Sequence, residues 1–392
     1  MTSETFDIPL GEPGFFAGDP DPALAELRRR CPVSWHARGD FWAVTRHADI
    51  QAISRDPDTF CSGRGILIAD RHRQVAAEDS LIYLDPPRHD SYRKLVNRAF
   101  TPRRVAALEP MVRDLATDLL HRIDPGRTVD LVDAVCAPLP MLVIAELLGL
   151  PSEDRDDFRR WSDAVMEAAS DLTEENALSA LELVAYFDRQ LDARSDSPTD
   201  DLLSALLAAE VEGTRLTRRE VQGFCMTLMV AGNETTRSLM AGGLIALAEH
   251  PDQRTQLVQD TARIPSAVEE LLRWVTPVMA MARTTTRPTT VAPVELGAGE
   301  YVVLAYGAGN RDEEVFGASA DRLDISRSPN PHLSFGFGEH FCIGASLARL
   351  ETRVLLEEVL RRWPDYVLAG DIERAPSTLM RQVTRAPVRL AP

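Results

Sequence analysis

The chain of 392 residues carries 60 acidic and 43 basic side chains, which gives a formal net charge of −17 at neutral pH. This acidic balance argues against a nucleic-acid partner, because proteins that bind a phosphate backbone present a basic face. Hydrophobic residues make up 44% and charged residues 26%, a composition that predicts a globular protein with a sizeable core and excludes a disordered chain.

The chain shows no sign of export or membrane insertion. No stretch approaches the roughly 18 uninterrupted apolar residues that span a bilayer, and the first residues lack the charged and apolar regions of a secretory signal. The five cysteines are odd in number and widely spaced, which argues against a disulfide framework or a multi-cysteine zinc site. We therefore expect a cytoplasmic protein.

Helical patterns dominate the first two hundred residues. A turn between 33–36 and 41–44 predicts a β-hairpin, and a helix is expected from about 47 to 55. Another helix is expected after two prolines at 86–87. Further helices are predicted at 103–123, 139–149, 152–170, 173–194 and 199–209.

The segment from Thr217 to Glu249 predicts an unusually long helix. Thr217 and Glu220 form a T-x-x-E capping box, and no proline interrupts the pattern before Pro251. At 1.5 Å per residue the helix would extend about 48 Å, enough to cross a whole domain. Its middle is apolar nearly all round and is followed by polar residues at 233–236, so we expect a kink or a bound ligand there.

A second capping box, Ser266 with Glu269, predicts a helix that ends at Thr276 and the proline after it. Short strand-like segments follow, separated by glycines, at 281–285, 294–296 and 301–304, with more near the end of the chain. We find no internal repeat and no low-complexity linker. The predicted fold class is mainly α with a small β component, as one compact unit.

Cys342 lies in a glycine-rich loop just before another predicted helix. The sequence from 335 to 351 reads FGFGEHFCIGASLARLE. Alternating glycines let a backbone pass close to a planar group. A cysteine at a helix N-terminus lies at the positive end of the helix dipole, which lowers the thiol pKa and favours a thiolate, a good metal ligand. The alternative is a buried structural cysteine.

This loop matches F-G-x-G-x-H-x-C-x-G-x-x-L-A-R-x-E at every fixed position and resembles the haem-binding loop of the cytochrome P450 family of monooxygenases. The resemblance implies the cytochrome P450 fold, a long central helix over a buried haem b, in a single haem domain that spans 1–392. Cys342 would be the axial thiolate ligand of the haem iron. The implied cofactor-binding residues are His89, Arg93, Ala231, Gly232, Arg283, Phe335, Gly336, His340, Cys342 and Gly344.

The polar segment of the long helix resembles the family's A-G-x-[D/E]-T motif, which begins here at Ala231. By resemblance, Gly232 leaves room for a diatomic ligand. Glu234 and Thr235 would be the catalytic acid–alcohol pair that delivers protons for oxygen activation. From the residues alone, Thr235 could instead donate a hydrogen bond to its own helix and Glu234 could form an ion pair in the core.

Glu270 and Arg273 form an E-x-x-R pair. At a surface such a pair is worth only about 0.2–0.5 kcal/mol, but in the family it is buried and locked by a third arginine downstream. The segment 310–324 resembles that downstream region and nominates Arg322. Proline usually follows the phenylalanine of this region, whereas Gly317 follows it here. We assign Glu270, Arg273 and Arg322 a structural role.

The propionate groups of a haem need hydrogen-bond donors, and the planar fork of arginine suits a carboxylate. The helix after the two prolines carries His89 and Arg93 on one face. By resemblance these two residues, together with Arg283 and His340, would hold the propionates. A lone histidine on a helix is usually solvated or part of the core, so the assignment of His89 depends on the resemblance.

The resemblance implies a monooxygenase that inserts one oxygen atom from dioxygen into a lipophilic small molecule of terpenoid, steroid, fatty acyl or polyketide type. Electrons would come from a separate ferredoxin or flavodoxin with its NAD(P)H-dependent reductase, and the protein would be a monomer. The alternatives are a peroxygenase that uses hydrogen peroxide and a P450-type rearrangement or coupling enzyme. From another class, a non-catalytic haem gas sensor is the alternative, although a sensor usually carries a signalling domain.

The resemblance to the family also indicates which parts of the chain would contact the substrate and the redox partner. The pocket is expected to be lined by 61–83, 155–194, the long helix before Gly232, 278–280 and the turn at 378–379. The methionines there either form an adaptable pocket or pack the core. An acidic ferredoxin would need a locally basic docking face. Candidates for this face are Lys94, the only lysine, and Arg98, Arg103, Arg104, Arg349 and Arg353.

Overall fold

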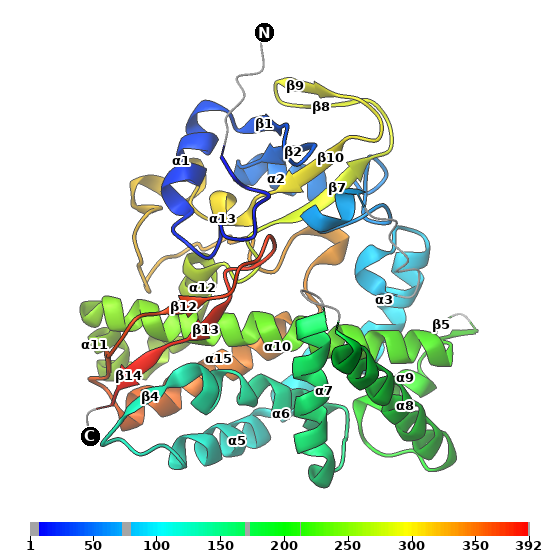
Figure 1. Cartoon of the computed structure of the whole chain (residues 1–392), viewed down its shortest axis with the longest axis vertical. Helices are drawn as coiled ribbons and strands as arrows, with labels where there is room; N and C mark the ends of the chain where they lie inside the picture. The colour runs from blue at the N-terminus through cyan, green and yellow to red at the C-terminus, as the bar shows by residue number, and fades with distance from the viewer. Residues whose placement is uncertain (1–7, 73–79, 169–172, 212, 391–392) are drawn as a thin grey trace.

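The computed structural model describes residues 8–72, 80–168, 173–211 and 213–390. A long helix, α10 (Arg218–Glu249), crosses the middle of the molecule (Figure 1). The predicted capping box is confirmed, because the Thr217 hydroxyl accepts a hydrogen bond from Glu220 N while the Glu220 carboxylate accepts one from Thr217 N. The helix is unbroken through the polar residues at 233–236.

Helices make up most of the fold. Several helices pack against α10, among them α6 (Pro138–Leu147), α12 (Ile264–Val275) and α15 (Ala345–Arg362), and α5 (Glu109–His121) packs on α6 and α15. In the part of the chain that the structure describes, no helix is long and apolar enough to cross a membrane. The other α-helices described are α1 (Asp21–Arg30), α2 (His47–Ser54), α3 (Arg88–Ala99), α4 (Pro102–Ala107), α7 (Arg155–Ala168), α8 (Glu174–Asp196), α9 (Leu202–Ala208), α11 (Pro251–Gln259), α13 (Tyr306–Gly309) and α14 (Glu313–Phe316).

A five-stranded sheet in the order β1-β2-β10-β7-β3 lies on the opposite side of α10 from α5 and α6 (Figure 1). β1 (Val33–His36) and β2 (Phe41–Val44) form the predicted hairpin. β2 pairs in parallel with β10 (Tyr301–Leu304), and β7 (Met281–Thr285) pairs antiparallel with both β10 and β3 (Phe60–Cys61). The strands predicted at 281–285 and 301–304 are therefore confirmed.

The remaining strands form small sheets around this frame. β8 (Thr289–Val291) pairs with β9 (Val294–Leu296), the third predicted strand. The other pairings are β5 (Glu210–Val211) with β6 (Thr214–Arg215), β12 (Glu373–Arg374) with β13 (Val383–Arg385), and β11 (Val367–Leu368) with β14 (Pro387–Arg389) and β4 (Thr128–Asp130). The fold is therefore mainly α with a small β component, as predicted.

The apolar core is divided between the helices and the sheet. The largest cluster lies among α10 and the helices packed on it. Two smaller clusters lie on the two faces of the sheet, and β10 contributes to both: Tyr301 and Val303 belong to one, Val302 and Leu304 to the other. This division follows from the alternation of side chains along a strand. β10 is thus a buried central strand.

The helix predicted at 103–123 is divided in two. α4 ends at Ala107 and α5 begins at Glu109, with Pro110 in the first turn of α5. Proline has no N–H to continue the hydrogen bonding of a preceding helix, but it is well suited to the first turn of a new one.

The capping box predicted at Ser266 and Glu269 is wrong. α12 begins earlier, at Ile264, and the Ser266 hydroxyl donates to the carbonyl oxygens of Arg263 and Ile325. A proline in the first turn of α12 needs no N–H partner, so the helix can start without a side-chain cap. The Glu269 side chain is thereby left to bind residues outside the helix.

The Glu270–Arg273 pair is confirmed as a fully buried ion pair with hydrogen bonds of 2.8 and 2.7 Å. The third arginine is Arg327 and not Arg322. Arg327 Nε lies 3.1 Å from Glu270 Oε2, and its guanidinium also donates to the Ser319 carbonyl. The Arg322 side chain is exposed, and only its backbone carbonyl accepts a hydrogen bond from Arg273.

We expect Arg327→Ala to lower the free energy of unfolding by about 2–4 kcal/mol, because it removes a charged donor from a carboxylate that solvent does not reach. Arg322→Ala, a matched control a few residues away, should change it by less than about 0.5 kcal/mol. Denaturant unfolding of the two variants measures both values. Equal effects would contradict the assignment of Arg327.

Candidate active site

The loop around Cys342 turns through two glycines with left-handed backbone conformation. Gly336 and Gly338 have φ angles of 68° and 74°, which residues with a side chain rarely adopt. A Cβ atom on Gly338 would also collide with the Ser54 carbonyl at the end of α2. Cys342 N donates to Phe335 O at 2.9 Å and closes the loop. The glycine pattern therefore reflects a requirement of the backbone.

Cys342 precedes α15, as predicted, but its thiol pKa is not lowered. Burial raises this pKa, whereas a hydrogen bond from Gly344 N and the nearby Arg93 and Arg349 guanidinium groups act in the opposite direction. The lowered pKa predicted from the helix dipole is wrong for the chain without a metal ion, because desolvation of the thiolate is the larger effect. A bound metal ion stabilises a thiolate directly.

Cys342 lines a cavity of about 230 Å³. Most of the wall is apolar, and it includes Leu81, Phe224 and Leu228. Two predicted site residues, His89 and Glu234, are not part of the wall. The predicted site residues that the cavity brings together are Arg93, Ala231, Gly232, Thr235, Arg283, Phe335, Gly336, His340, Cys342 and Gly344.

Arg93 and Arg283 bring positive charge to the cavity without a carboxylate partner among the described residues. Arg93 Nη2 donates to Phe341 O at 2.5 Å, and Arg283 Nη1 donates to Ala282 O at 2.7 Å. Each guanidinium group has five N–H donors, so both retain donors for another acceptor. Because buried cations are normally paired, this part of the wall suits the anionic groups of a ligand.

The His89 and His340 rings lie next to each other, with centroids 4.5 Å apart. Burial and the positive charge of Arg283 lower the pKa of His340 to about 3, so its ring is neutral at neutral pH. His340 Nε2 lies 3.1 Å from the Ser62 hydroxyl. Nε2 of the buried His89 has no hydrogen-bond partner. A ligand that accepts a hydrogen bond would satisfy this nitrogen.

Ala231 and Gly232 line the cavity from α10. A Cβ atom on Gly232 would lie only 2.9 Å from Ile144 Cδ1 of α6, closer than real carbon contacts allow. A side chain at position 232 would therefore have to displace the Ile144 methyl group, so close packing of α10 on α6 favours a glycine there, in addition to the space for a diatomic ligand that the sequence suggested.

Comparison with known proteins agrees with this geometry. A family model described as Cytochrome P450 matches residues 130–364. The methyl-branched lipid omega-hydroxylase of Mycobacterium tuberculosis is 39% identical, over 97% of this chain and 94% of that protein. The vitamin D(3) 25-hydroxylase of Pseudonocardia autotrophica is 40% identical, over 97% and 96%. The chain belongs to the cytochrome P450 family.

A solved structure supports the same conclusion for the fold. CYP109E1 from Bacillus megaterium, in complex with testosterone, superimposes with a TM-score of 0.88 at 33% identity, over 96% of this chain and 100% of that one. With hydroxylases among its relatives, the protein is a cytochrome P450 monooxygenase whose cofactor is haem b. The predicted family, fold, enzyme class and cofactor are thus confirmed.

The cavity residues fit this cofactor. Cys342 would hold the iron, and the guanidinium groups of Arg93 and Arg283, with the unpartnered Nε2 of His89, would bind the propionates. When bound, haem supplies the iron at which dioxygen is activated. The protein's own contribution is to hold the cofactor, to exclude water with an apolar wall and to position groups that carry protons.

The two predicted catalytic residues of this P450 have protein partners in the structure. Thr235 Oγ1 donates to Ala231 O at 2.6 Å. Glu234 is buried and accepts hydrogen bonds from Arg237, at 2.5 Å, and from Gln382, which directly precedes β13. These contacts match the alternative interpretation of the two residues. Proton delivery by this pair stays a prediction.

Sequence reasoning missed two contacts that shape the site. Arg349, expected on the docking face, forms two hydrogen bonds of 2.6 and 2.8 Å with Glu269. Its guanidinium lies over the Phe335 ring, 4.5 Å from the centroid, and so supports the start of the cysteine loop. The L-A-R-x-E part of the motif could have indicated this role. The contact of Gln382 with Glu234 has no signal in the local sequence.

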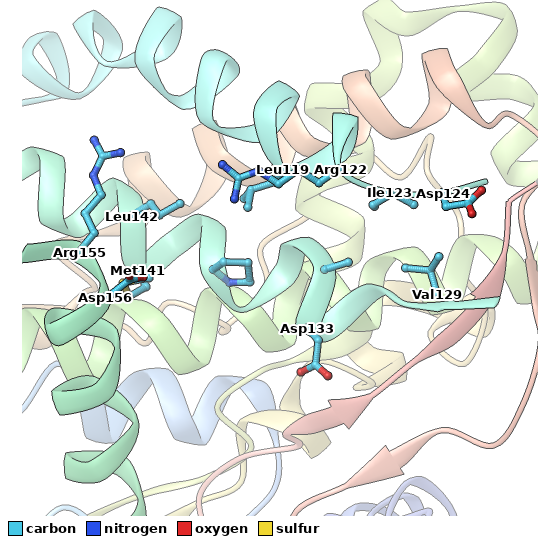
Figure 2. A pocket seen from close by; sticks show the side chains of 12 residues that line it. Leu119, Arg122, Ile123, Asp124, Val129, Asp133, Met141, Leu142, Arg155 and Asp156 are labelled. Carbon is cyan, nitrogen blue, oxygen red and sulfur yellow. The ribbon is translucent and has the colours of Figure 1, made fainter. Parts of the chain in front are cut away.

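A second cavity, of about 410 Å³, shares no lining residue with the haem cavity. Figure 2 shows side chains of its wall, which come from α5, α6, α7 and the segment between α5 and α6. The charged residues in this wall have opposite signs, since Arg122 and Arg155 are basic and Asp124, Asp133 and Asp156 are acidic. This mixture is typical of a solvated hollow.

We expect Cys342→Ser to lose the long-wavelength Soret band that reduced P450 enzymes give with carbon monoxide, because this band requires a thiolate ligand. Spectra recorded at equal haem content test the expectation. Cys31→Ser, which changes a partly buried cysteine at the end of α1, should keep the band. A Cys342→Ser protein that keeps it would exclude Cys342 as the iron ligand.

Proposed function

We propose that this cytochrome P450 hydroxylates a lipophilic small molecule of terpenoid, steroid, fatty acyl or polyketide type. One atom of dioxygen enters the substrate and the other leaves as water. The observation that carries the proposal is the apolar wall beside Cys342, to which Leu81, Phe224, Leu228 and Val278 contribute. Such a wall favours an apolar ligand, because binding removes apolar surface from water on both sides.

The relatives support the same class of substrate. Their names give a methyl-branched lipid and vitamin D(3) as the molecules hydroxylated, and the similar solved structure holds testosterone. All three molecules are mainly apolar, although they differ in shape. This range supports the class of substrate and favours no single member of it.

The segments expected to line the pocket contribute unequally. Residues of α10 before Gly232 line it, as do Leu81, Val278 and Met281. Met279 is only 2% exposed and packs in the core cluster under the sheet, so for this methionine the core alternative is correct. None of the described side chains at 155–194 or 378–379 belongs to the wall.

Glu234 and Thr235 are proposed to deliver protons. Glu234 lies outside the cavity wall, so it must act through Thr235 or through water. Thr235 faces the cavity, and its oxygen can accept a hydrogen bond while it donates to Ala231 O. A peroxygenase, which would take both oxygen atoms from hydrogen peroxide, has no need for this pair.

Cytochrome P450 enzymes typically draw electrons from redox partners, and we propose a ferredoxin or flavodoxin with its NAD(P)H-dependent reductase. Of the candidate docking cations, Lys94, Arg98 and Arg103 are exposed, and Arg98 donates to the carbonyl oxygen of Glu210. Arg104 and Arg353 form ion pairs with Asp200 and Glu109, as Arg349 does with Glu269. These pairs reduce the net positive charge of the proposed face, so its basic centre would be Lys94, Arg98 and Arg103.

The proposal includes a single haem domain over 1–392, a monomer and a cytoplasmic location. The cysteines support the location, because none of the five forms a disulfide.

A screen of lipophilic compounds for the haem spin-state shift tests the substrate class. Leu228→Lys should weaken binding of the best compound at least tenfold, roughly the effect of burying a charge without a partner. Leu181→Lys, at a position 65% exposed on α8, is the control and should leave binding unchanged. The proposal fails if no compound of these lipophilic classes produces a shift.

We expect Thr235→Ala to divert NAD(P)H electrons away from product, roughly tenfold or more, because general-acid groups commonly contribute factors of that size. The measurement is product formed per NAD(P)H consumed with the best compound of the screen. Thr255→Ala removes a hydroxyl that makes the same kind of backbone contact on the exposed face of α11, and coupling should stay normal. Unchanged coupling in Thr235→Ala would contradict its role in proton delivery.

A further inference from the structure

Glu351 ends the sequence motif that contains Cys342, and the proposed function gives it no role. It lies one helical turn after Leu347 and Ala348 on α15, and all three residues line the haem cavity. The Glu351 side chain is only 2% exposed. Its Oε2 atom is buried without a hydrogen-bond partner. A carboxyl group in this position needs an explanation.

Other buried carboxyl groups of the described residues do have donors. Glu270 accepts hydrogen bonds from Arg273 and Arg327, and Glu234 accepts one from Arg237. Glu351 is therefore the exception among the buried acids in the described part of the chain. The remaining buried acids with donors are Asp70, Asp201, Asp312 and Glu358.

Burial raises the pKa of Glu351 to about 8, and no charged group contributes to the shift. The cations on the helices packed against α15 either bind other groups or, like Arg103 of α4, are exposed to solvent, so none neutralises a Glu351 carboxylate. The neutral acid is consequently the main form at neutral pH. The groups bound to other partners are Glu234 and Arg237 of α10, Glu269 of α12 with Arg349 of α15, Glu270 and Arg273 of α12, Glu109 and Arg113 of α5, Arg104 of α4 with Asp200, and Arg254 of α11 with Tyr366 O.

We propose that Glu351 stores a proton for the monooxygenase reaction and releases it into the haem cavity. The proposal rests on the proposed hydroxylation, in which substrate, dioxygen, two electrons and two protons give hydroxylated product and one water. The acid gives its proton to water in the cavity and becomes a carboxylate. It takes a proton back from bulk water before the next turnover. Glu351 acts from α15, whereas Thr235 acts from α10 on the same cavity.

Infrared spectra of the haem-loaded protein test the protonation state without any substrate. The wild type should show a carboxylic C=O band at neutral pH that disappears as the pH rises through about 8, and Glu351→Gln should lack this band. A wild-type spectrum without such a band would overturn the proposal. Because no substrate is present, failure of the proposed substrate class would leave this result unaffected.

The pH dependence of stability gives a second readout. The pKa of Glu351 rises from 4.5 to about 8 on folding, so between these values the folded chain binds one more proton than the unfolded chain. The contribution of Glu351 to the free energy of unfolding is therefore lost as the pH rises between these two pKa values. In Glu351→Gln, the slope of the unfolding free energy against pH should change by about one proton there. An unchanged slope would contradict a neutral Glu351.

The amount of product formed per NAD(P)H consumed, the coupling, tests whether Glu351 releases its proton. With the compound that gives the largest spin-state shift, Glu351→Gln should lower product formed per NAD(P)H by several-fold, at unchanged haem content and unchanged compound binding. Glu351→Asp should restore part of the loss, because it returns an acid to the site. Glu357→Gln, on the same helix but paired with Arg113 and Arg353, is the matched control and should couple normally. Normal coupling in Glu351→Gln would overturn proton release by Glu351.

Discussion

Arg273 determines how the chain that leads into the cysteine loop packs on α12. Its guanidinium binds the Glu270 carboxylate and donates to the carbonyl groups of Asn310, Ala320 and Arg322. The ion pair is completely inaccessible to solvent, where an unpaired charge or carbonyl group would be costly. Each donor therefore needs its acceptor in place, which leaves this part of the chain little freedom.

Asn310 carries the constraint from Arg273 to the active site. Its Oδ1 accepts a hydrogen bond from Leu333 N at 2.6 Å, and its Nδ2 donates to the Thr276 and Ser334 hydroxyls at 2.8 and 2.9 Å. Leu333 and Ser334 directly precede Phe335, where the cysteine loop begins. A buried charge cluster thus sets where the loop starts, and the left-handed glycines within it set where Cys342 arrives.

Two features encoded by neighbouring residues were predicted correctly, whereas several features that depend on distant contacts were not. The cap at Thr217 and the glycine pattern before Cys342 act within a few residues, and the structure agrees with both. The choice between Arg322 and Arg327 depends on which side chain faces α12, which no local pattern determines. Gln382 lies 148 positions from Glu234, so their contact exists only in the folded chain. The direction of the Cys342 pKa likewise depended on burial, a property of the whole fold.

The parallel pairing of β2 with β10 has a consequence for how the protein is made. Trp42 pairs with Val302, 260 positions later. At roughly 5–20 residues per second, a ribosome needs on the order of tens of seconds to supply that partner strand. The β1–β2 hairpin therefore leaves the ribosome with the outer edge of β2 unpaired, and an unpaired edge can pair with another chain. The strand order of the sheet thus exposes the N-terminal hairpin to misassembly until most of the protein has been synthesised.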